Sequence, residues 1–268
     1  MPELPETETI ARDLDAVLRG ARIRTVTVLR GDVVRGMRLI TPDAMRLITR
    51  PIVAVTRRAK SIVMALDGAA RVVVTPRFTG ALLLRDARGE SRAPADSATA
   101  ALRSAPPQQP VGPPPEPLPY CCVQFRLSDL RLVEYVDVRR LGTLELMPEL
   151  RFAAWDSALG PEPLDPTLTA ERFSGILRGS NRAVKTVLMD QKRLAGVGNI
   201  YANEALWRAG IRPARRASAV TRVEAARLLD ALREILTASI ALRGTTFRDF
   251  QDAYGGRGGY AKELKVYG

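Results

Sequence analysis

Residues 188–206 read LMDQKRLAGVGNIYANEAL, and this stretch decides how the C-terminal half of the chain is interpreted. A helical pattern over residues 182–191 stops before the turn GVGN at 196–199, and a second one opens at that turn and stops at Gly210. Four basic side chains surround the two helices: Arg182, Lys185, Lys192 and Arg193. Helices joined by tight glycine turns under basic side chains predict a pair that grips DNA phosphates. A helical bundle with a solvated basic face stays open as the alternative from these residues alone.

The helical pattern continues on both sides of this stretch. Phe173, Ile176 and Leu177 mark a helix that ends at Gly179. Further on, the capping box TRVE at 221–224 opens a longer helix. Its apolar residues fall on one face: Leu228, Leu232, Ile235, Leu236 and Ile240. We therefore expect residues 148–268 to form an all-helical domain.

The N-terminal half has a different pattern. Residues 5–18 predict an amphipathic helix, with Pro5 in an acidic first turn and Gly20 just past the end. Short β-rich runs follow at 23–28, 52–57, 61–66, 70–75, 81–85, 121–127 and 132–136. Strands of this length and spacing predict a sandwich or barrel within residues 1–147. Nine of the 19 prolines lie between 88 and 119 without apolar periodicity, so we expect a disordered insertion there.

Composition limits the chemistry that the chain can carry. Its 268 residues suit two domains, and 41 Lys and Arg against 29 Asp and Glu give a net charge of +12, which attracts nucleic acid. Histidine is absent, which excludes Ser-His and Cys-His catalysis and histidine-ligated metals. The two cysteines, Cys121 and Cys122, are adjacent and predict neither a disulfide framework nor a four-ligand zinc site. Without about 18 consecutive apolar residues or a signal peptide, we expect a cytoplasmic protein with no membrane segment.

The second residue carries a possible nucleophile. Removal of the initiator methionine would leave the secondary amine of Pro2 as the free chain end. An α-amino group titrates near about 8, against about 10.4 for lysine, so part of it is an uncharged nucleophile at neutral pH. Attack on a sugar C1′ gives a cationic iminium, an electron sink that permits elimination of the 3′ phosphate. The neighbouring Glu3 can supply the proton transfers.

Five motifs together resemble the formamidopyrimidine-DNA glycosylase family of base-excision repair enzymes. They are PELPETETI at 2–10, RRAK at 57–60, LGPEPL at 159–164, the stretch 188–206 and RGTTFRDFQDAYGGRGGYAKELKVYG at 243–268. The resemblance covers nearly the whole chain outside the insertion. It implies an α+β fold: an N-terminal helix plus a two-layer β-sandwich, followed by an all-α helix-two-turn-helix domain, with DNA in the cleft between them.

The resemblance also implies catalytic roles for particular residues. Pro2 would be the Schiff-base nucleophile, Glu3 the acid and base, and Lys60 an amine that assists β-elimination. Glu6 and Tyr201 fall in motifs that line the cleft, so we expect them in the lesion pocket. The implied activity is a bifunctional DNA glycosylase and AP lyase that removes 8-oxoguanine and formamidopyrimidines from duplex DNA.

Further residues are expected to contact DNA. Lys185 matches a helical lysine that contacts phosphate, with Arg182 beside it. Asn199 begins a helix, where its side chain can cap the helix and its amide can reach a phosphate. Tyr120 lies in the stretch that replaces the family's phosphate-contacting histidine, which weakens that contact.

Base flipping leaves a hole in the duplex, which the family fills with side chains from two β-loops. Here TPRFTG at 75–80 supplies Phe78, and VDVRRLG at 136–142 supplies Arg139 and Leu141. Phe78 and Leu141 are apolar wedges that can unstack a base step. Arg139 can donate to the orphaned base, which contributes about 1–3 kcal/mol of base discrimination.

The family normally continues past the KVYG motif into a four-cysteine zinc finger, which this sequence does not encode. We therefore expect no metal and no cofactor in this chain, whether the finger is naturally absent or the sequence is truncated. The finger's arginine assists δ-elimination, so we expect β-elimination products with little δ-product.

Two alternatives to an oxidised-purine glycosylase stay open. The wedge residues of this chain differ from the set that is common in the family, which suits an endonuclease VIII-like enzyme with oxidised-pyrimidine preference. PELPE at the N-terminus, however, is typical of the purine branch. A catalytically weak damaged-DNA-binding protein is the other. The expected partner is damaged double-stranded DNA, bound by a bacterial, nucleoid-associated monomer.

Overall fold

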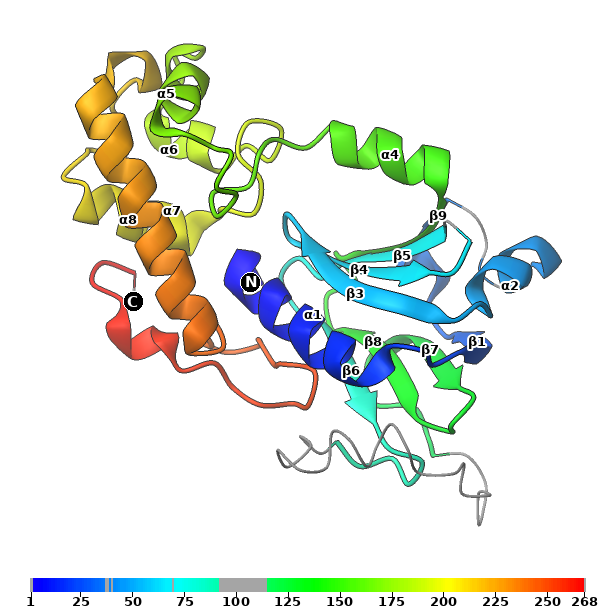
Figure 1. The fold of residues 1–268 in the computed structure, drawn as a ribbon. Coiled ribbons are helices and arrows are strands. Elements are labelled where there is room, and N and C mark those ends of the chain that lie inside the picture. The colour runs from blue at the N-terminus through cyan, green and yellow to red at the C-terminus, as the bar shows by residue number, and fades with distance from the viewer. Residues whose placement is uncertain (1, 37–38, 40, 69, 92–114, 268) are drawn as a thin grey trace.

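The computed structural model describes residues 2–36, 39, 41–68, 70–91 and 115–267. It contains two β-sheets in the N-terminal half and a group of helices in the C-terminal half (Figure 1). The core of the expected insertion lies outside the described residues. No helix in the described part of the chain is long and apolar enough to cross a membrane.

The strands form two sheets. The four-stranded sheet has the order β1 (Ile23–Val28), β7 (Cys121–Leu127), β8 (Leu132–Asp137) and β6 (Gly80–Arg85). The five-stranded sheet has the order β2 (Val34–Gly36), β9 (Thr143–Pro148), β5 (Ala70–Thr75), β4 (Ser61–Leu66) and β3 (Ile52–Arg58). All neighbours are antiparallel except β2 and β9. The α+β class and the seven expected strands are confirmed.

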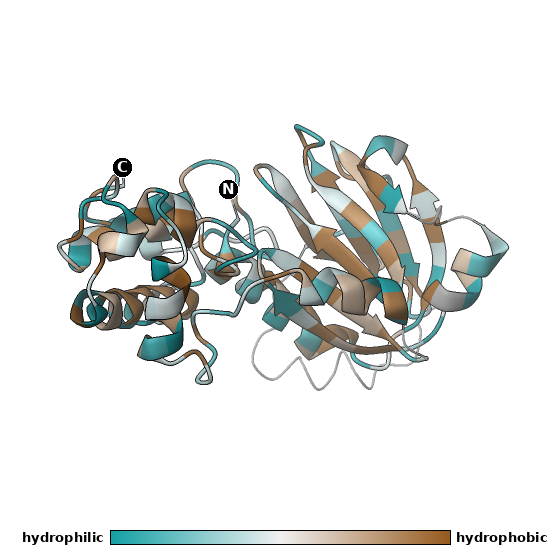
Figure 2. Cartoon of the chain, turned by 90° about the horizontal axis from the view of Figure 1, so that it is seen from above, coloured by the Kyte–Doolittle hydropathy of each residue, from teal (hydrophilic) through white to brown (hydrophobic). Residues whose placement is uncertain are grey.

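Both sheets bury one face in a shared core, to which alternate residues of a strand such as Ile62, Met64 and Leu66 belong. Inward residues of both sheets belong to one hydrophobic cluster, for example Val72 and Phe125. Helix α1 (Leu4–Leu18) adds Ile10 and Leu14 to that cluster and packs against β3. Figure 2 shows hydrophobic residues recurring along the strands of both sheets.

The helical half has its own core. It is built from α5 (Ala170–Arg178), α6 (Val184–Leu188), α7 (Asn199–Arg208) and α8 (Arg222–Ala241). The expected capping box is present, because Thr221 accepts from the Glu224 N–H and the Glu224 carboxylate accepts from the Thr221 N–H. Leu4 of α1 is also part of this core, so the N-terminal helix joins the two halves.

Five elements differ from the sequence expectations. The helix expected over 182–191 is shorter, because α6 ends at Leu188 and Asp190 caps the following turn by accepting the Lys192 N–H. Three elements were not expected: β2, α2 (Pro42–Ile48) and β9. Helix α4 (Glu149–Ser157) belongs to the expected helical half, yet it packs on the outer face of the five-stranded sheet.

Candidate active site

The candidate active site forms where the N-termini of α1 and α7 meet. The Leu4 N–H donates to the Gly196 carbonyl at 3.1 Å, which holds the start of α1 against the glycine turn. Glu3 is fully buried, and its Oε1 accepts from the Ile200 N–H at 3.0 Å. The carboxylate therefore satisfies a free amide at the positive end of α7. Pro2, also buried, precedes Glu3 directly.

The sequence led us to expect that Asn199 would cap α7 with its own side chain. Asn199 is instead the first residue of α7, and its Nδ2 lies 3.4 Å from the Tyr267 hydroxyl. The capping oxygen comes from Glu3, 197 residues away in sequence. The helix start that the sequence located is confirmed, but the group that satisfies its amides comes from α1.

Glu3 has an unusual electrostatic environment. Burial raises its pKa to about 7, against an opposing effect of the nearby Lys60 charge. Its Oε2 has no hydrogen-bond partner among the described residues. A carboxyl group that is about half protonated at neutral pH can both donate and accept a proton, and this is what an acid and base catalyst needs.

Lys60 lies in the turn between β3 and β4. Ala59 before it has a φ of 54°, a left-handed conformation that turns the chain sharply. Glu162 holds this turn, because its carboxylate accepts from the Ala59 N–H at 2.7 Å and pairs with both Arg57 and Arg58. Burial lowers the pKa of the Lys60 amine, opposed by the nearby carboxylates. The two arginines of the RRAK motif thus serve the interdomain contact.

Gly198 brings the two catalytic candidates together. A Cβ atom at this position would lie 2.3 Å from both the Lys60 Nζ and the carboxyl carbon of Glu3. Only glycine leaves room for these groups beside the N-terminus of α7. The sequence places Glu3, Lys60 and this glycine turn in three separate motifs, and the fold packs them into one site.

Glu6 and Tyr201 were expected to line the lesion pocket. Both are fully buried, and the Tyr201 hydroxyl donates to Glu6 Oε1 at 2.5 Å. Glu6 also accepts the N–H groups of Glu3 and Thr245, at 2.8 and 2.7 Å. Burial raises the pKa of Glu6, and neither residue lines the cavity beside Glu3. The structure therefore places them behind the site, where they anchor Glu3.

A cavity of about 300 Å³ opens beside Glu3. Its wall contains residues from α1, a β-loop, α7 and the C-terminal segment: Glu3, Phe78, Asn199, Ile200, Thr245, Phe247, Arg248, Asp249, Phe250 and Tyr267. The rings of Phe247 and Tyr267 lie 5.4 Å apart within this wall. The sequence does not single out the wall residues between 245 and 267, although the motif at 243–268 contains them.

One wedge candidate, Phe78, belongs to the wall of this cavity. Phe78 and Leu141 are 43% and 48% exposed, so two apolar side chains stand free for a partner. The Arg139 guanidinium lies 5.9 Å from the centre of the Phe78 ring, which brings the tips of the two loops together. Tyr120 is 63% exposed, and its carbonyl accepts the Asp137 N–H at 3.1 Å next to the same loop.

The other DNA-contact candidates lie on the helical half. Lys185 is partly exposed on α6, and its N–H lies 3.3 Å from the Pro213 carbonyl. Arg182 is exposed, but its guanidinium forms an ion pair with Asp190 at 2.9 Å. The structure therefore leaves Lys185 as the more available phosphate ligand of the two.

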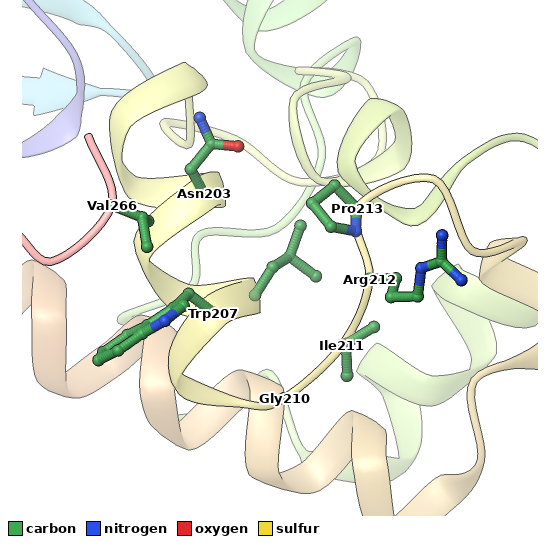
Figure 3. Close-up of a pocket in the computed structure, with 8 residues that line it drawn as sticks. Asn203, Trp207, Gly210, Ile211, Arg212, Pro213 and Val266 are labelled. Atoms are coloured by element: carbon green, nitrogen blue, oxygen red, sulfur yellow. The ribbon is translucent and has the colours of Figure 1, made fainter. Parts of the chain in front are cut away.

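A larger cavity, of about 450 Å³, lies along α7 (Figure 3). Asn203, Trp207 and Arg212 are among its lining residues, together with Val266 near the end of the described chain. None of the expected site residues lines it, and no carboxylate does. We therefore assign the smaller cavity beside Glu3 to the chemistry.

The donor set does not fit a structural zinc. No group of three or more His, Cys, Asp or Glu side chains within the described ranges could hold a metal ion. Cys121 and Cys122 are buried on β7, and burial raises the pKa of Cys121 to about 12, so its thiolate is disfavoured.

Comparison with known proteins shows the family of the chain. The formamidopyrimidine-DNA glycosylase N-terminal domain matches residues 1–144, and the formamidopyrimidine-DNA glycosylase H2TH domain matches residues 159–251. The chain belongs to the formamidopyrimidine-DNA glycosylase family. It is a base-excision repair DNA glycosylase, and its partner is DNA.

Individual relatives match the chain along its whole length. A formamidopyrimidine-DNA glycosylase from Thermomicrobium roseum is 39% identical over 273 residues, covering 100% of this chain and 88% of that protein. The crystal structure of the MutM (Fpg) protein from Thermus thermophilus has a TM-score of 0.79 at 32% identity, covering 100% and 87%. A Lactococcus lactis Fpg bound to DNA containing N7-benzyl-Fapy-dG has a TM-score of 0.79 at 26% identity, covering 99% and 88%.

Proposed function

We propose that this glycosylase removes oxidised purines, 8-oxoguanine and formamidopyrimidines, from duplex DNA through a Schiff base on Pro2. The observation that carries the proposal is the convergence of Glu3, with a pKa near 7, and Lys60 on Gly198, directly beside Pro2. The comparisons support the same substrate class, since a solved relative is bound to Fapy-dG DNA.

Three groups share the reaction: the Pro2 amine, the Glu3 carboxyl and the Lys60 ammonium. The Pro2 amine forms a bond to C1′ of the damaged nucleotide, the glycosidic bond breaks, and the base leaves after it gains a proton. The sugar ring opens when its ring oxygen is protonated, which leaves an iminium between Pro2 and C1′. Loss of a C2′ proton then pushes electrons toward the 3′ carbon, and the 3′ phosphate leaves in β-elimination.

Glu3 is suited to the proton transfers in this sequence. With a pKa of about 7, one carboxyl group can give a proton to the ring oxygen and later accept the C2′ proton. Lys60 is buried beside it and its ammonium would stabilise the negative charge that develops on the leaving phosphate. Water then hydrolyses the iminium and frees Pro2.

The wedge and the helical half would hold the DNA. Phe78 and Leu141 would fill the hole left by the flipped nucleotide, and Arg139 would donate to the orphaned base. Tyr120, Lys185 and Asn199 are proposed to contact phosphates. We also propose that the protein acts on bacterial DNA as a monomer and needs no bound metal or cofactor.

Borohydride trapping tests the proposal. Reduction of the iminium would give a stable covalent complex with duplexes that contain 8-oxoguanine or an abasic site, but little with thymine glycol. A protein that keeps Met1 or carries an N-terminal tag should bind DNA without being trapped. Trapping on thymine glycol alone would favour the oxidised-pyrimidine activity. No trapping on any duplex would favour a binding protein.

A further inference from the structure

One buried carboxylate lies beneath both wedge loops. Asp137, at the end of β8, is 1% exposed and accepts four hydrogen bonds. Its Oδ1 accepts from the Thr79 hydroxyl at 2.5 Å and from the Arg139 N–H at 3.2 Å. Its Oδ2 accepts from the Gly142 N–H at 2.8 Å and from the Tyr135 hydroxyl at 3.2 Å. All four donors are satisfied by one side chain.

These donors come from both loops. Thr79 directly follows the wedge residue Phe78, while Arg139 and Gly142 bracket the wedge residue Leu141. The Thr79 hydroxyl also accepts the Arg139 N–H at 3.0 Å. The two loops are therefore joined by a direct hydrogen bond as well as through the Asp137 carboxylate. The strands that flank the loops also pair, at Gly80 with Asp137 and at Thr75 with Thr143.

The loop backbones are strained and closely packed. Arg77 and Arg140, each of which precedes a wedge residue, have φ values of 53° and 52°, in the left-handed region that side chains disfavour. A Cβ at Gly142 would lie 2.1 Å from the Tyr135 hydroxyl. Loops in such conformations need fixed partners, and the Asp137 carboxylate supplies them.

We propose that Asp137 is a positioning residue that fixes the two wedge loops relative to each other, so that Phe78 and Leu141 enter the duplex as one unit. The inference rests on the wedge role proposed above. Two loops that moved independently would lose conformational entropy on insertion, whereas a joined pair is already ordered before it meets DNA.

Asp137→Asn is the informative substitution because it keeps the size of the side chain. An amide has one accepting oxygen, so its NH₂ group faces either the Arg139 N–H or the Gly142 N–H. The Thr79 and Tyr135 hydroxyls can rotate to accept from the amide, but a backbone N–H cannot. One anchor of the Leu141 loop is therefore lost in either orientation.

Two further variants separate positioning from stability. Thr79→Val removes the hydroxyl that links the two loops. Tyr135→Phe is the matched control, since it removes a hydrogen bond to the same carboxylate from a strand residue. Thermal unfolding of each variant shows how far the fold itself is weakened.

The readout is β-elimination at an abasic site in duplex DNA and in single-stranded DNA, where no base pair needs to be replaced. We expect Asp137→Asn and Thr79→Val to lose about tenfold in rate on the duplex and to stay within about twofold on the single strand. Tyr135→Phe should stay near the parent rate on both. A 2-aminopurine next to the abasic site should brighten less with Asp137→Asn, because the step is unstacked less completely.

Leu141→Ala distinguishes this inference from the proposed wedge. If Leu141→Ala lowers the duplex rate and Asp137→Asn does not, the wedge stands and the role of Asp137 is wrong. If Leu141→Ala has no effect, both fail. Asp137→Asn in the Leu141→Ala background should add little, because both changes remove the same insertion. Additive losses, or equal losses on duplex and single strand, would overturn the positioning role.

Discussion

The catalytic pocket and the wedge loops differ in how far their side chains are exposed to solvent. Glu3 lies at 0% exposure in a pocket where a glycine makes room for neighbouring charges, whereas Phe78 and Leu141 stand 43% and 48% exposed. Burial tunes the proton affinity of Glu3, and exposure leaves the wedge free to enter DNA. Changes in the pocket should therefore affect every substrate, while changes in the wedge should affect only those that must be unstacked.

The largest effect is expected from Gly198→Ala. The added methyl group would lie 2.3 Å from both the Lys60 Nζ and the Glu3 carboxyl carbon, so one of them must move. We expect β-elimination to fall by roughly 10²-fold or more on duplex and single-stranded abasic DNA alike. Single-turnover rates on both substrates check this, with Gly210→Ala, remote from the site, as a control for strain at a helix end. A loss confined to the duplex would show that Gly198 acts on the unstacking of DNA and not on the catalytic pocket.

Glu3→Gln is expected to have the next largest effect on the reaction rate. Loss of the acid and base group should slow base excision by about 10²-fold and remove the inflection near pH 7 from its pH–rate profile. Rates of 8-oxoguanine release between pH 5.5 and 8.5 test this. A variant that keeps the same inflection would assign that titration to another group.

The same substitution should change how stability depends on pH. Folding raises the pKa of Glu3 from 4.5 to about 7, so its favourable contribution is present below about 4.5 and lost as the pH rises through about 7. Between those values the parent protein should lose about 3 kcal/mol, to order of magnitude, relative to Glu3→Gln. Urea unfolding at pH 5 and pH 8 provides the measurement, and parallel curves would contradict a raised pKa.

At the wedge, Phe78→Ala should lower the reaction rate less than the pocket substitutions do, and only on duplex DNA. We expect about a tenfold slower excision from duplex DNA, because one base step is no longer unstacked, and an unchanged rate on a single-stranded abasic site. Excision with each of the four opposite bases shows whether Arg139 still discriminates. Equal loss on the single strand would mean that Phe78 serves the pocket, whose wall it also lines.

The smallest effect is expected from Lys185→Ala on the helical half. Removal of one phosphate contact should lower the slope of log K against log salt by about 0.9 and weaken binding to damaged and undamaged duplexes alike. Arg182→Ala serves as the comparison, since the Arg182 side chain is already paired with Asp190. Anisotropy titrations at several salt concentrations measure both slopes. A larger change in slope for Arg182→Ala would make Arg182, and not Lys185, the phosphate ligand.

Sequence periodicity predicted most of the fold for local physical reasons. The core strands are short apolar runs, and α1 repeats apolar residues at helical spacing, so each pattern is visible within a few residues. Strand β2 has only three residues and pairs with β9 in parallel, a partner more than 100 residues away, so no local pattern marks it. Helix α4 buries no residue fully and has a weak apolar face.

The site was predictable only where a motif named the residue. Pro2, Glu3 and Lys60 were found in this way, but the packing of Lys60 and Glu3 on Gly198 depends on three segments that meet only in the fold. Glu6 looked like a pocket residue because it belongs to the same motif as Glu3. Glu6 is instead the third residue of α1 and closes its capping box, so its carboxylate accepts from the Glu3 N–H and from the Tyr201 hydroxyl. Asp137 carried no sequence signal beyond its place in the wedge loop.

We propose that the Pro2 amine, and no lysine, forms the covalent bond to the damaged nucleotide. Borohydride reduction with an abasic duplex, followed by proteolysis and mass spectrometry, locates the attached sugar on the chain. We expect the added mass on the N-terminal peptide, at Pro2, and no adduct when Met1 is retained. An adduct on the peptide that contains Lys60, formed at the same rate with a blocked N-terminus, would contradict it.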